Sequence, residues 1–223
     1  MTDDEILQAA LRTHTDYGAE GLDENGIVRD PFEQLALWLA EAAERGVYEP
    51  NAMALATIDP DGAPSIRTVL LRRLDEHGLA FYTDYNSRKG RALLAHPDVA
   101  AVFPWYVLHR QVTIAGRVER TGDADSDDYF SARPRGAQVA AWASEQSHPI
   151  ADRAALEQRV KDAEHRFEGT SELPRPERWG GFRIVPHRLE FWQGRTSRLH
   201  DRLVFEREPG LPGAPWQLSR LQP

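Results

Sequence analysis

Basic residues gather at residues 67–91 of a chain that is acidic overall. The six basic residues of this stretch are Arg67, Arg72, Arg73, Arg88, Lys89 and Arg91, against the three acids Asp75, Glu76 and Asp84, while the whole protein has a formal net charge of −8. Ser87 is a good N-cap, so the cations after it would lie in the first turn of a helix, where the helix dipole disfavours positive charge. A bound anion would remove this repulsion. The stretch therefore predicts a phosphate-binding site, with a solvated basic face as the alternative.

A second basic cluster follows a predicted strand near the C-terminus. The strand ends at Trp192, a glycine-containing loop comes next, and Arg198, His200 and Arg202 then recur at every second residue. In an extended strand this spacing places all three side chains on one face. Three stacked cations repel one another unless a ligand compensates, so the cluster predicts contact with an anionic or electron-rich group.

Two further polar groups could bind the same kind of ligand. Tyr129 and Arg133 are four residues apart near a predicted helix end, so they would share one face. The alternative is a helix C-terminus that carries favourable cations. Gln146 and Ser147 lie in a polar stretch whose alternative reading is an ordinary turn after a helix. A site rich in Arg, Lys, Gln, Ser, Tyr and Trp binds phosphates and flat rings and leaves the difficult chemistry to a cofactor.

Composition and motifs exclude several classes of protein. The 223-residue chain has no Cys, which rules out disulfides, a thiol nucleophile and cysteine-based zinc sites. With 27 Lys and Arg against 35 Asp and Glu, we expect no binding of nucleic acid or of anionic membranes. No P-loop, Rossmann, zincin or hydrolase signature occurs. No apolar run reaches the length of a membrane span and the acidic N-terminus is unlike a signal peptide, so we expect a cytoplasmic protein, without a metal.

The elements that must position these residues are mostly short strands. We predict strands at residues 52–58, 67–71, 79–83, 99–107, 110–119, 182–185, 188–192, 202–206 and 216–221, and helices at 3–11, 31–46, 87–96, 126–132, 136–145 and 151–167. Residues 67–83 form a hairpin that turns at 75–78. Successive strands joined by short turns favour antiparallel pairing in a meander or barrel. We expect a helix and a mobile arm at 1–29 and one domain at 30–223, with a helical insert at about 125–170 and C-terminal strands at 180–223.

Nine short motifs occur in an order that resembles a known family. They are RTVLLR at 67–72, FYT at 81–83, SRKG at 87–90, FPW at 103–105, RQV at 110–112, YFxxRPRxxQ at 129–138, QS at 146–147, WGGFR at 179–183 and FWQGxxxRLHDR at 191–202. Together they resemble pyridoxamine 5′-phosphate oxidase, a flavin enzyme family, over residues 45–223. The order of the motifs is specific, although each motif alone is weak.

The resemblance implies a fold and a set of site residues. The fold would be mainly β with α insertions, an antiparallel, Greek-key-like split barrel that binds FMN at the interface of a homodimer. The FMN site would contain Arg67, Thr68, Val69, Leu70, Leu71, Arg72, Tyr82, Thr83, Arg88, Lys89, Gln111, Gln146, Ser147, Trp192 and Arg202, some of them from the partner subunit. The substrate site would contain Arg72, Tyr129, Arg133, Ala137, Arg198 and His200, of which Arg198 and His200 would be catalytic.

The resemblance also implies a reaction and leaves alternatives. Pyridoxamine or pyridoxine 5′-phosphate would lose a hydride from C4′ to the flavin, and oxygen would take the electrons and form hydrogen peroxide. Arg72 and Ala137 depart from the Lys and Ser common at these positions, and the lost Ser hydroxyl would cost about 1 kcal/mol of binding. The alternatives are a phenazine-pathway type of oxidase, a non-catalytic flavin or pyridoxal-phosphate binding protein, and a small barrel for single-stranded nucleic acid.

Overall fold

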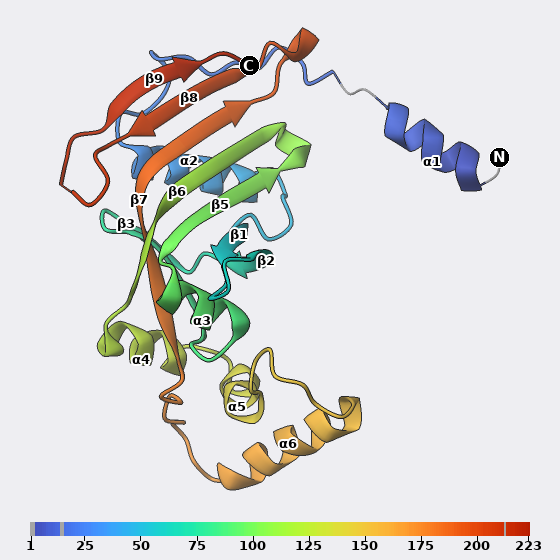
Figure 1. Ribbon diagram of the computed structural model, residues 1–223, viewed down its shortest axis with the longest axis vertical. Coiled ribbons are helices and arrows are strands. Elements are labelled where there is room, and N and C mark those ends of the chain that lie inside the picture. Colours follow the sequence, from blue (N-terminus) through green and yellow to red (C-terminus); the bar gives the residue numbers. More distant parts are fainter. Residues whose placement is uncertain (1–2, 14–15, 212) are drawn as a thin grey trace.

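The protein, described by a computed structural model over residues 3–13, 16–211 and 213–223, is built on one antiparallel sheet. The helices are α1 (Asp3–Arg12), α2 (Pro31–Glu44), α3 (Arg88–Ala95), α4 (Asp123–Ser131), α5 (Arg135–Ala143) and α6 (Arg153–Arg166). The strands are β1 (Ala52–Ile58), β2 (Pro64–Leu70), β3 (Arg73–Asp75), β4 (Gly78–Asp84), β5 (Asp98–Trp105), β6 (Arg110–Arg120), β7 (Trp179–Gln193), β8 (Asp201–Glu206) and β9 (Gln217–Leu221). The sheet order is β2-β1-β5-β6-β7-β4-β3, and β8 pairs with β7 and β9 (Figure 1). The predicted mainly antiparallel class is confirmed.

The curved sheet encloses the main hydrophobic core. Alternate residues of β5 and β6 face inward, and Phe103, Val112 and Ile114 are each 0% exposed. Helix α2 covers one side of this core, where the Trp38 ring meets Phe191 edge-on with centroids 5.2 Å apart. Burial of these apolar side chains fixes the sheet whose ends carry the polar site residues.

A smaller core joins the helical insert to the start of β7. Its buried members are Phe130, Val139, Ala143, Ala163, Phe167, Leu173 and Trp179. Helices α4, α5 and α6 lie together at one end of the molecule, beside α3 and the first residues of β7 (Figure 1). The insert that we predicted at about 125–170 therefore forms its own hydrophobic cluster next to the basic turn of α3.

The predicted hairpin at residues 67–83 is wrong in one respect. Strand β2 ends at Leu70 and pairs with β1, with Thr57 opposite Ser65 across a turn at residues 59–63. The hairpin partner of β4 is the short strand β3, with Leu74 opposite Leu79. The turn at 59–63 has hairpin chemistry of its own, since the Asp59 backbone N–H donates to the Ala63 carbonyl at 2.8 Å.

The two strands predicted at 182–185 and 188–192 are one strand. Strand β7 runs unbroken over 15 residues, although Pro186 lacks a backbone donor. The pairing of β6 with β7 shifts register between Ala115 and Gly116, and Gly116 lies opposite Pro186. This bulge absorbs the proline, so one strand pairs with β4 near its start and with β8 near its end.

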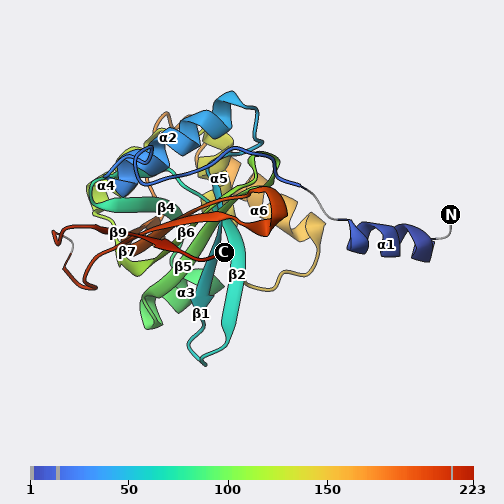
Figure 2. The same cartoon turned by 90° about the horizontal axis from the view of Figure 1, so that it is seen from above.

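The N-terminal segment begins apart from the sheet and then joins it. Both views show α1 away from the rest of the protein (Figures 1 and 2). Further along, Leu22 and Ile27 are buried in the main core, and the Leu22 backbone N–H donates to Asp201 at 3.0 Å. The predicted mobility of this arm stays a prediction. Among the described residues, no helix is both long enough and apolar enough to cross a membrane.

Candidate active site

The first turn of α3 holds two cations in place by different partners. Ser87 caps the helix as predicted, accepting from the Gly90 backbone N–H at 3.1 Å. Lys89 Nζ donates to Thr83 Oγ1 at 3.0 Å and to Gln146 Oε1 at 2.9 Å. Arg88 has a different partner, and its Nε donates to the buried carboxylate of Asp59 at 2.7 Å. The helix start therefore presents an ammonium group and a guanidinium group, each held by its own partners.

The surroundings of Lys89 disfavour its charged ammonium form. Burial, followed by the positive charge of Arg67, lowers the pKa of Lys89 to about 8, and Asp84 opposes this only in part. Its hydrogen-bond partners, a hydroxyl and an amide oxygen, are neutral. A bound dianion would restore the favourable environment of the ammonium group, so this position fits a phosphate ester.

The guanidinium group of Arg67, on β2, lies near the first turn of α3. Its Nη1 donates to Thr57 Oγ1 at 2.7 Å and to the Leu55 carbonyl at 3.2 Å, and its Nη2 donates to Ser65 Oγ at 2.5 Å. Burial lowers the pKa of Arg67, and the charge of Arg88 adds to the shift. Arg67 thus lies within electrostatic range of both Arg88 and Lys89, which is compatible with the predicted phosphate site.

A cavity of about 810 Å³ opens beside Lys89. Its walls come from β2, β4, the α4–α5 region and the start of β7, and the residues are Thr68, Val69, Leu70, Arg72, Tyr82, Thr83, Asp84, Lys89, Tyr129, Ala132, Arg133, Pro134, Ala137, Ala140, Ala141, Ser144, Gln146 and Trp179. Most of the predicted substrate residues and eight of the fifteen predicted FMN residues therefore line one hollow. Predicted residues Leu71 and Ser147 do not line it; Leu71 is buried in the main core and Ser147 is exposed.

Arg133 reaches this cavity with part of its hydrogen-bonding capacity unused. The guanidinium carbon lies 4.6 Å from the centre of the Trp179 ring, and burial lowers the pKa of Arg133. Its Nη1 atom is buried and has no hydrogen-bond partner among the described residues. A buried guanidinium N–H without an acceptor is costly, so the geometry fits an anionic ligand at this end of the cavity.

Aromatic rings form the wall next to Arg133. Tyr82 and Tyr129 stack with centroids 4.0 Å apart and planes 13° apart, and Trp179 lies parallel to Tyr82 at 5.7 Å. Tyr129 and Arg133 are not on one regular helical face, because α4 ends at Ser131 and Arg133 follows it. They nevertheless line the same cavity, as we predicted from their spacing.

Arg198 and His200 lie in a different hollow, and their predicted placement on a strand face is wrong. Residues Thr196–Arg198 form a 3₁₀ turn with Arg198 at a φ of 60°, and β8 begins only at Asp201. The two side chains line a pocket of about 550 Å³ together with Thr13, Asp16, Tyr17, Arg195 and Ser197. Within the described residues of one chain, this pocket shares no lining residue with the Lys89 cavity.

His200 has a defined ring state in this pocket. The Arg195 backbone N–H donates to His200 Nδ1 at 3.1 Å, so the neutral ring carries its proton on Nε2. Burial, and then the charge of Arg198, lowers the pKa of His200. Trp192 and Tyr17 flank the ring with centroids 4.7 and 5.6 Å away. A neutral imidazole with a free Nε2–H beside a guanidinium can bind and orient an electron-rich ring.

The remaining predicted FMN residues belong to the side of the sheet near His200. Gln111 lies opposite Trp192 in the β6–β7 pairing, and Trp192 lies opposite Arg202 in the β7–β8 pairing. Arg202 Nε donates to the buried Glu190 carboxylate at 2.6 Å. In one chain the predicted residues therefore divide into two groups, one around Lys89 and Arg133 and one around Trp192 and His200.

Sequence reasoning missed several residues of the site. Trp179 supports Arg133, and Asp59 holds Arg88. Asp84 accepts from Arg178 Nε at 3.0 Å and lines the cavity beside Lys89. Trp179 could have been found, since it is the first residue of the motif WGGFR. Asp59 could not, because its partner Arg88 is 29 residues away and the pair leaves no local signal.

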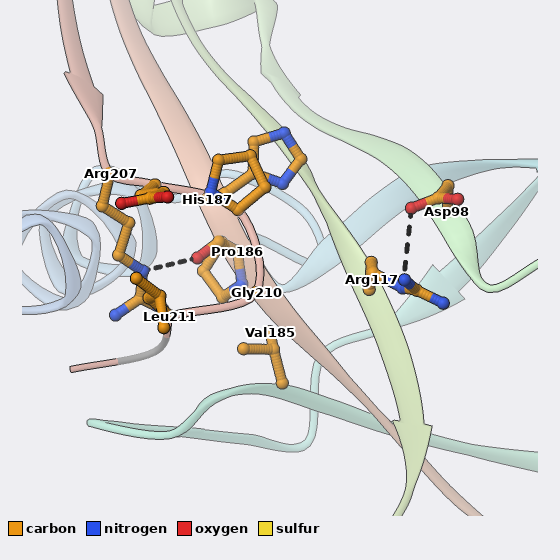
Figure 3. Close-up of a pocket in the computed structure, with 10 residues that line it drawn as sticks. Asp98, Arg117, Val185, Pro186, His187, Arg207, Gly210 and Leu211 are labelled. Carbon is orange, nitrogen blue, oxygen red and sulfur yellow. Dashed lines mark hydrogen bonds and ion pairs between the residues drawn. The ribbon is translucent and has the colours of Figure 1, made fainter. Parts of the chain in front are cut away.

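A further hollow of about 250 Å³ lies between β6, β7 and the residues after β8 (Figure 3). Its Arg117 is 3.7 Å from Asp98, and Arg207 Nε donates to the Pro186 carbonyl at 2.9 Å. No predicted site residue lines this hollow.

Comparison with known proteins defines the class first. A solved FMN-binding, pyridoxamine 5′-phosphate oxidase-related protein from Nostoc punctiforme superposes with a TM-score of 0.67 over 88% of this chain and 100% of that chain, at 17% identity, so the fold is that of this group. Residues 39–167 match the family model described as pyridoxamine 5′-phosphate oxidase. Residues 179–223 match the pyridoxine 5′-phosphate oxidase C-terminal dimerisation region.

Relatives then identify the family. A pyridoxine/pyridoxamine 5′-phosphate oxidase of Rubrobacter xylanophilus is 52% identical over 93% of this chain and 94% of its own length, and one of Streptomyces avermitilis is 46% identical over the full length of both. The chain belongs to the pyridoxamine 5′-phosphate oxidase family. The predictions of an oxidoreductase, of FMN as its cofactor and of a dimerising split barrel are confirmed.

A third comparison keeps the substrate open. PhzG from Burkholderia lata 383, solved in complex with tetrahydrophenazine-1-carboxylic acid, superposes with a TM-score of 0.83 at 32% identity, over 92% of this chain and 100% of that chain.

Proposed function

We propose that this protein oxidises pyridoxine 5′-phosphate or pyridoxamine 5′-phosphate to pyridoxal 5′-phosphate. The observation that carries the proposal is the cavity beside Lys89, which has a cationic group at each of two places, Lys89 itself and the pair Arg72 and Arg133. Two anionic groups, one on the cofactor and one on the substrate, would satisfy both. A substrate without an anionic group would leave the buried Nη1 of Arg133 without an acceptor.

Each group of residues has its own task in this proposal. Arg67, Arg88 and Lys89 hold the phosphate of FMN, and Thr83 and Gln146 orient the Lys89 ammonium group. Arg133 and Tyr129 bind the phosphate of the substrate, against the wall formed by Trp179. Bound FMN would supply the hydride acceptor for the substrate carbon and the route by which the two electrons reach oxygen, with hydrogen peroxide as the product.

Arg198 and His200 act on the substrate ring from a second subunit. They line a separate pocket in one chain, and the C-terminal region that carries them matches a dimerisation region. In a symmetric dimer each subunit contributes both parts, one to each of two equivalent sites. Gln111, Trp192 and Arg202 would reach the flavin in the same way. We also expect the enzyme in the cytoplasm.

The test is oxygen consumption by the purified, FMN-loaded protein. We expect a yellow protein that consumes oxygen and releases hydrogen peroxide with pyridoxine 5′-phosphate, and far more slowly with pyridoxine, which has no phosphate. If the purified protein is colourless and does not bind FMN that is added to it, the cofactor assignment is contradicted. Equal rates of oxygen consumption with pyridoxine 5′-phosphate and with pyridoxine would contradict the substrate assignment.

A second candidate is oxidation of a phenazine precursor, which the similarity to PhzG favours. The same assay separates the two. Turnover of a reduced phenazine carboxylic acid without turnover of pyridoxine 5′-phosphate would establish the second candidate.

A further inference from the structure

The β1–β2 hairpin buries polar side chains next to the arginines of the phosphate site. Thr57 and Asp59 are 2% and 6% exposed, and Ser65 is half-buried opposite Thr57. A buried carboxylate and hydroxyls cost free energy unless they are hydrogen-bonded. Their hydrogen-bond partners therefore indicate what they do.

These three side chains form one hydrogen-bonded chain. Ser65 Oγ accepts from Arg67 Nη2 at 2.5 Å and donates to Asp59 Oδ1 at 3.0 Å. Thr57 Oγ1 accepts from Arg67 Nη1 at 2.7 Å and lies 3.2 Å from Ser65 Oγ. The single proton and two lone pairs of Ser65 are thereby used in full.

The far end of the chain holds the second arginine. Asp59 Oδ2 accepts from Arg88 Nε at 2.7 Å and lies 2.5 Å from Arg88 Nη2. The hydrogen bond from Arg88 lowers the pKa of Asp59, so the carboxylate stays ionised. Arg67 and Arg88, from β2 and α3, are thus joined through Ser65 and Asp59.

The two arginines are held in different ways. Arg88 is paired directly with a carboxylate, whereas the side-chain hydrogen bonds of Arg67 among the described residues go only to neutral oxygens. Neutral acceptors fix the direction of a guanidinium fork without cancelling its charge. Arg67 is therefore oriented in advance and keeps its full charge for an anion.

We propose that Thr57, Ser65 and Asp59 are positioning residues that set the orientation of Arg67 and Arg88 for the cofactor phosphate. The inference rests on the proposed function, because it takes these arginines as ligands of FMN. Orientation before binding lowers the entropy lost on binding, so the hydroxyls strengthen phosphate recognition without touching the phosphate.

The experiment compares FMN with riboflavin, which has the same ring and no phosphate. Apoprotein is titrated with each ligand, and the dissociation constants come from the quenching of flavin fluorescence. Ser65→Ala and Thr57→Val leave every formal charge unchanged. For each variant we expect the dissociation constant of FMN to rise about fivefold to tenfold, with that of riboflavin unchanged.

Two controls separate positioning from general damage. Asp61→Asn alters the same hairpin at an exposed carboxylate whose one hydrogen-bond donor among the described residues is the Ala63 backbone N–H, and it should leave both constants unchanged. In an Arg67→Lys background, which keeps the charge but not the guanidinium fork, Ser65→Ala should weaken FMN binding less than it does in the unmodified protein, because Ser65 orients that fork.

The outcomes distinguish this inference from the proposed function. If Ser65→Ala weakens FMN and riboflavin equally, or weakens neither, the positioning role is wrong. If the unmodified protein binds FMN no better than riboflavin, the phosphate site itself is wrong, and the proposed function fails with it.

Discussion

Lys89 combines burial with a neighbouring cation, and the result is a pKa of about 8 in the protein without ligand. A bound phosphate favours the charged form and raises this pKa again. At pH 8.5 Lys89 should be partly deprotonated in the free protein and fully protonated in the complex. FMN binding at this pH should therefore take up a fraction of a proton. The affinity for FMN should accordingly fall as the pH rises through 8.

Calorimetry in two buffers of different ionisation heat measures this proton uptake. Lys89→Arg is the matched control, since an arginine stays charged in this range and should bind FMN without proton uptake at pH 8.5. The same uptake in both proteins would assign the proton to another group.

Arg133 should matter for the substrate and not for the flavin. Removal of a charged hydrogen-bond donor that meets a phosphate costs roughly ten- to hundredfold in binding. We expect Arg133→Ala to raise the KM for pyridoxine 5′-phosphate by this factor, with the dissociation constant of FMN unchanged. Steady-state oxygen consumption and a flavin titration on the same preparation give both numbers. A large loss of FMN would place Arg133 in the cofactor site instead.

Helix α2 is the clearest case of an element that its own residues define. Asp30 accepts from the backbone N–H groups of Phe32 and Glu33 at 2.7 and 3.0 Å, and Pro31 opens the helix. Loss of such an N-cap costs about 1 kcal/mol. Asp30→Ala should lower the free energy of unfolding in urea by this amount and leave the KM values unchanged.

The exposed Glu44 at the other end of α2 gives the comparison. Glu44→Ala should alter the free energy of unfolding by less than about 0.5 kcal/mol. An equal loss in both variants would mean that the cap itself contributes nothing.

Local signals located some elements and could not locate others. Ser87 and Asp30 predicted their helices because a cap and its first turn are adjacent in sequence. Pro186 suggested a break in β7, but the strand continues there because Ala115 of β6 pairs with Arg188 and Gly116 pairs with Pro186, which leaves His187 as the extra residue of a bulge. That pairing depends on another strand and could not be predicted from the residues around Pro186. The period-two spacing of Arg198, His200 and Arg202 suggested a strand, but a positive φ at Ser197 and Arg198 turns the chain there.

The candidate site shows the same limit. Spacing along the chain predicted that Tyr129 and Arg133 lie together, and they do line one cavity. It could not show that Arg198 and His200 line another pocket of the same chain, since that depends on where the chain turns between β7 and β8. In the proposed shared site their meeting with Arg133 would depend on how two subunits pair, and such pairing leaves no local signal.

At the scale of the whole molecule, the proposal of shared sites predicts complementation. Arg67→Ala should lose FMN, and Arg198→Ala should lose turnover while it keeps FMN. When the two variants are unfolded together and refolded, half of the dimers are mixed, and each has one site with neither change. The mixture should recover about a quarter of the unmodified activity, measured as oxygen consumption.

Each variant refolded alone is the control and should stay inactive. If the mixture also stays inactive while gel filtration shows dimers, Arg67 and Arg198 belong to the same subunit's site.

Strand β7 is a spacer of fixed length. It begins at Trp179, in the wall of the Lys89 cavity, and ends near Trp192, beside the His200 ring. The two hollows are therefore roughly 40 Å apart along the strand. One molecule of pyridoxine 5′-phosphate is much shorter than this distance, so it cannot contact both hollows of the same subunit. Dilution below the dimer dissociation constant should therefore abolish turnover through geometry alone, with every subunit still folded.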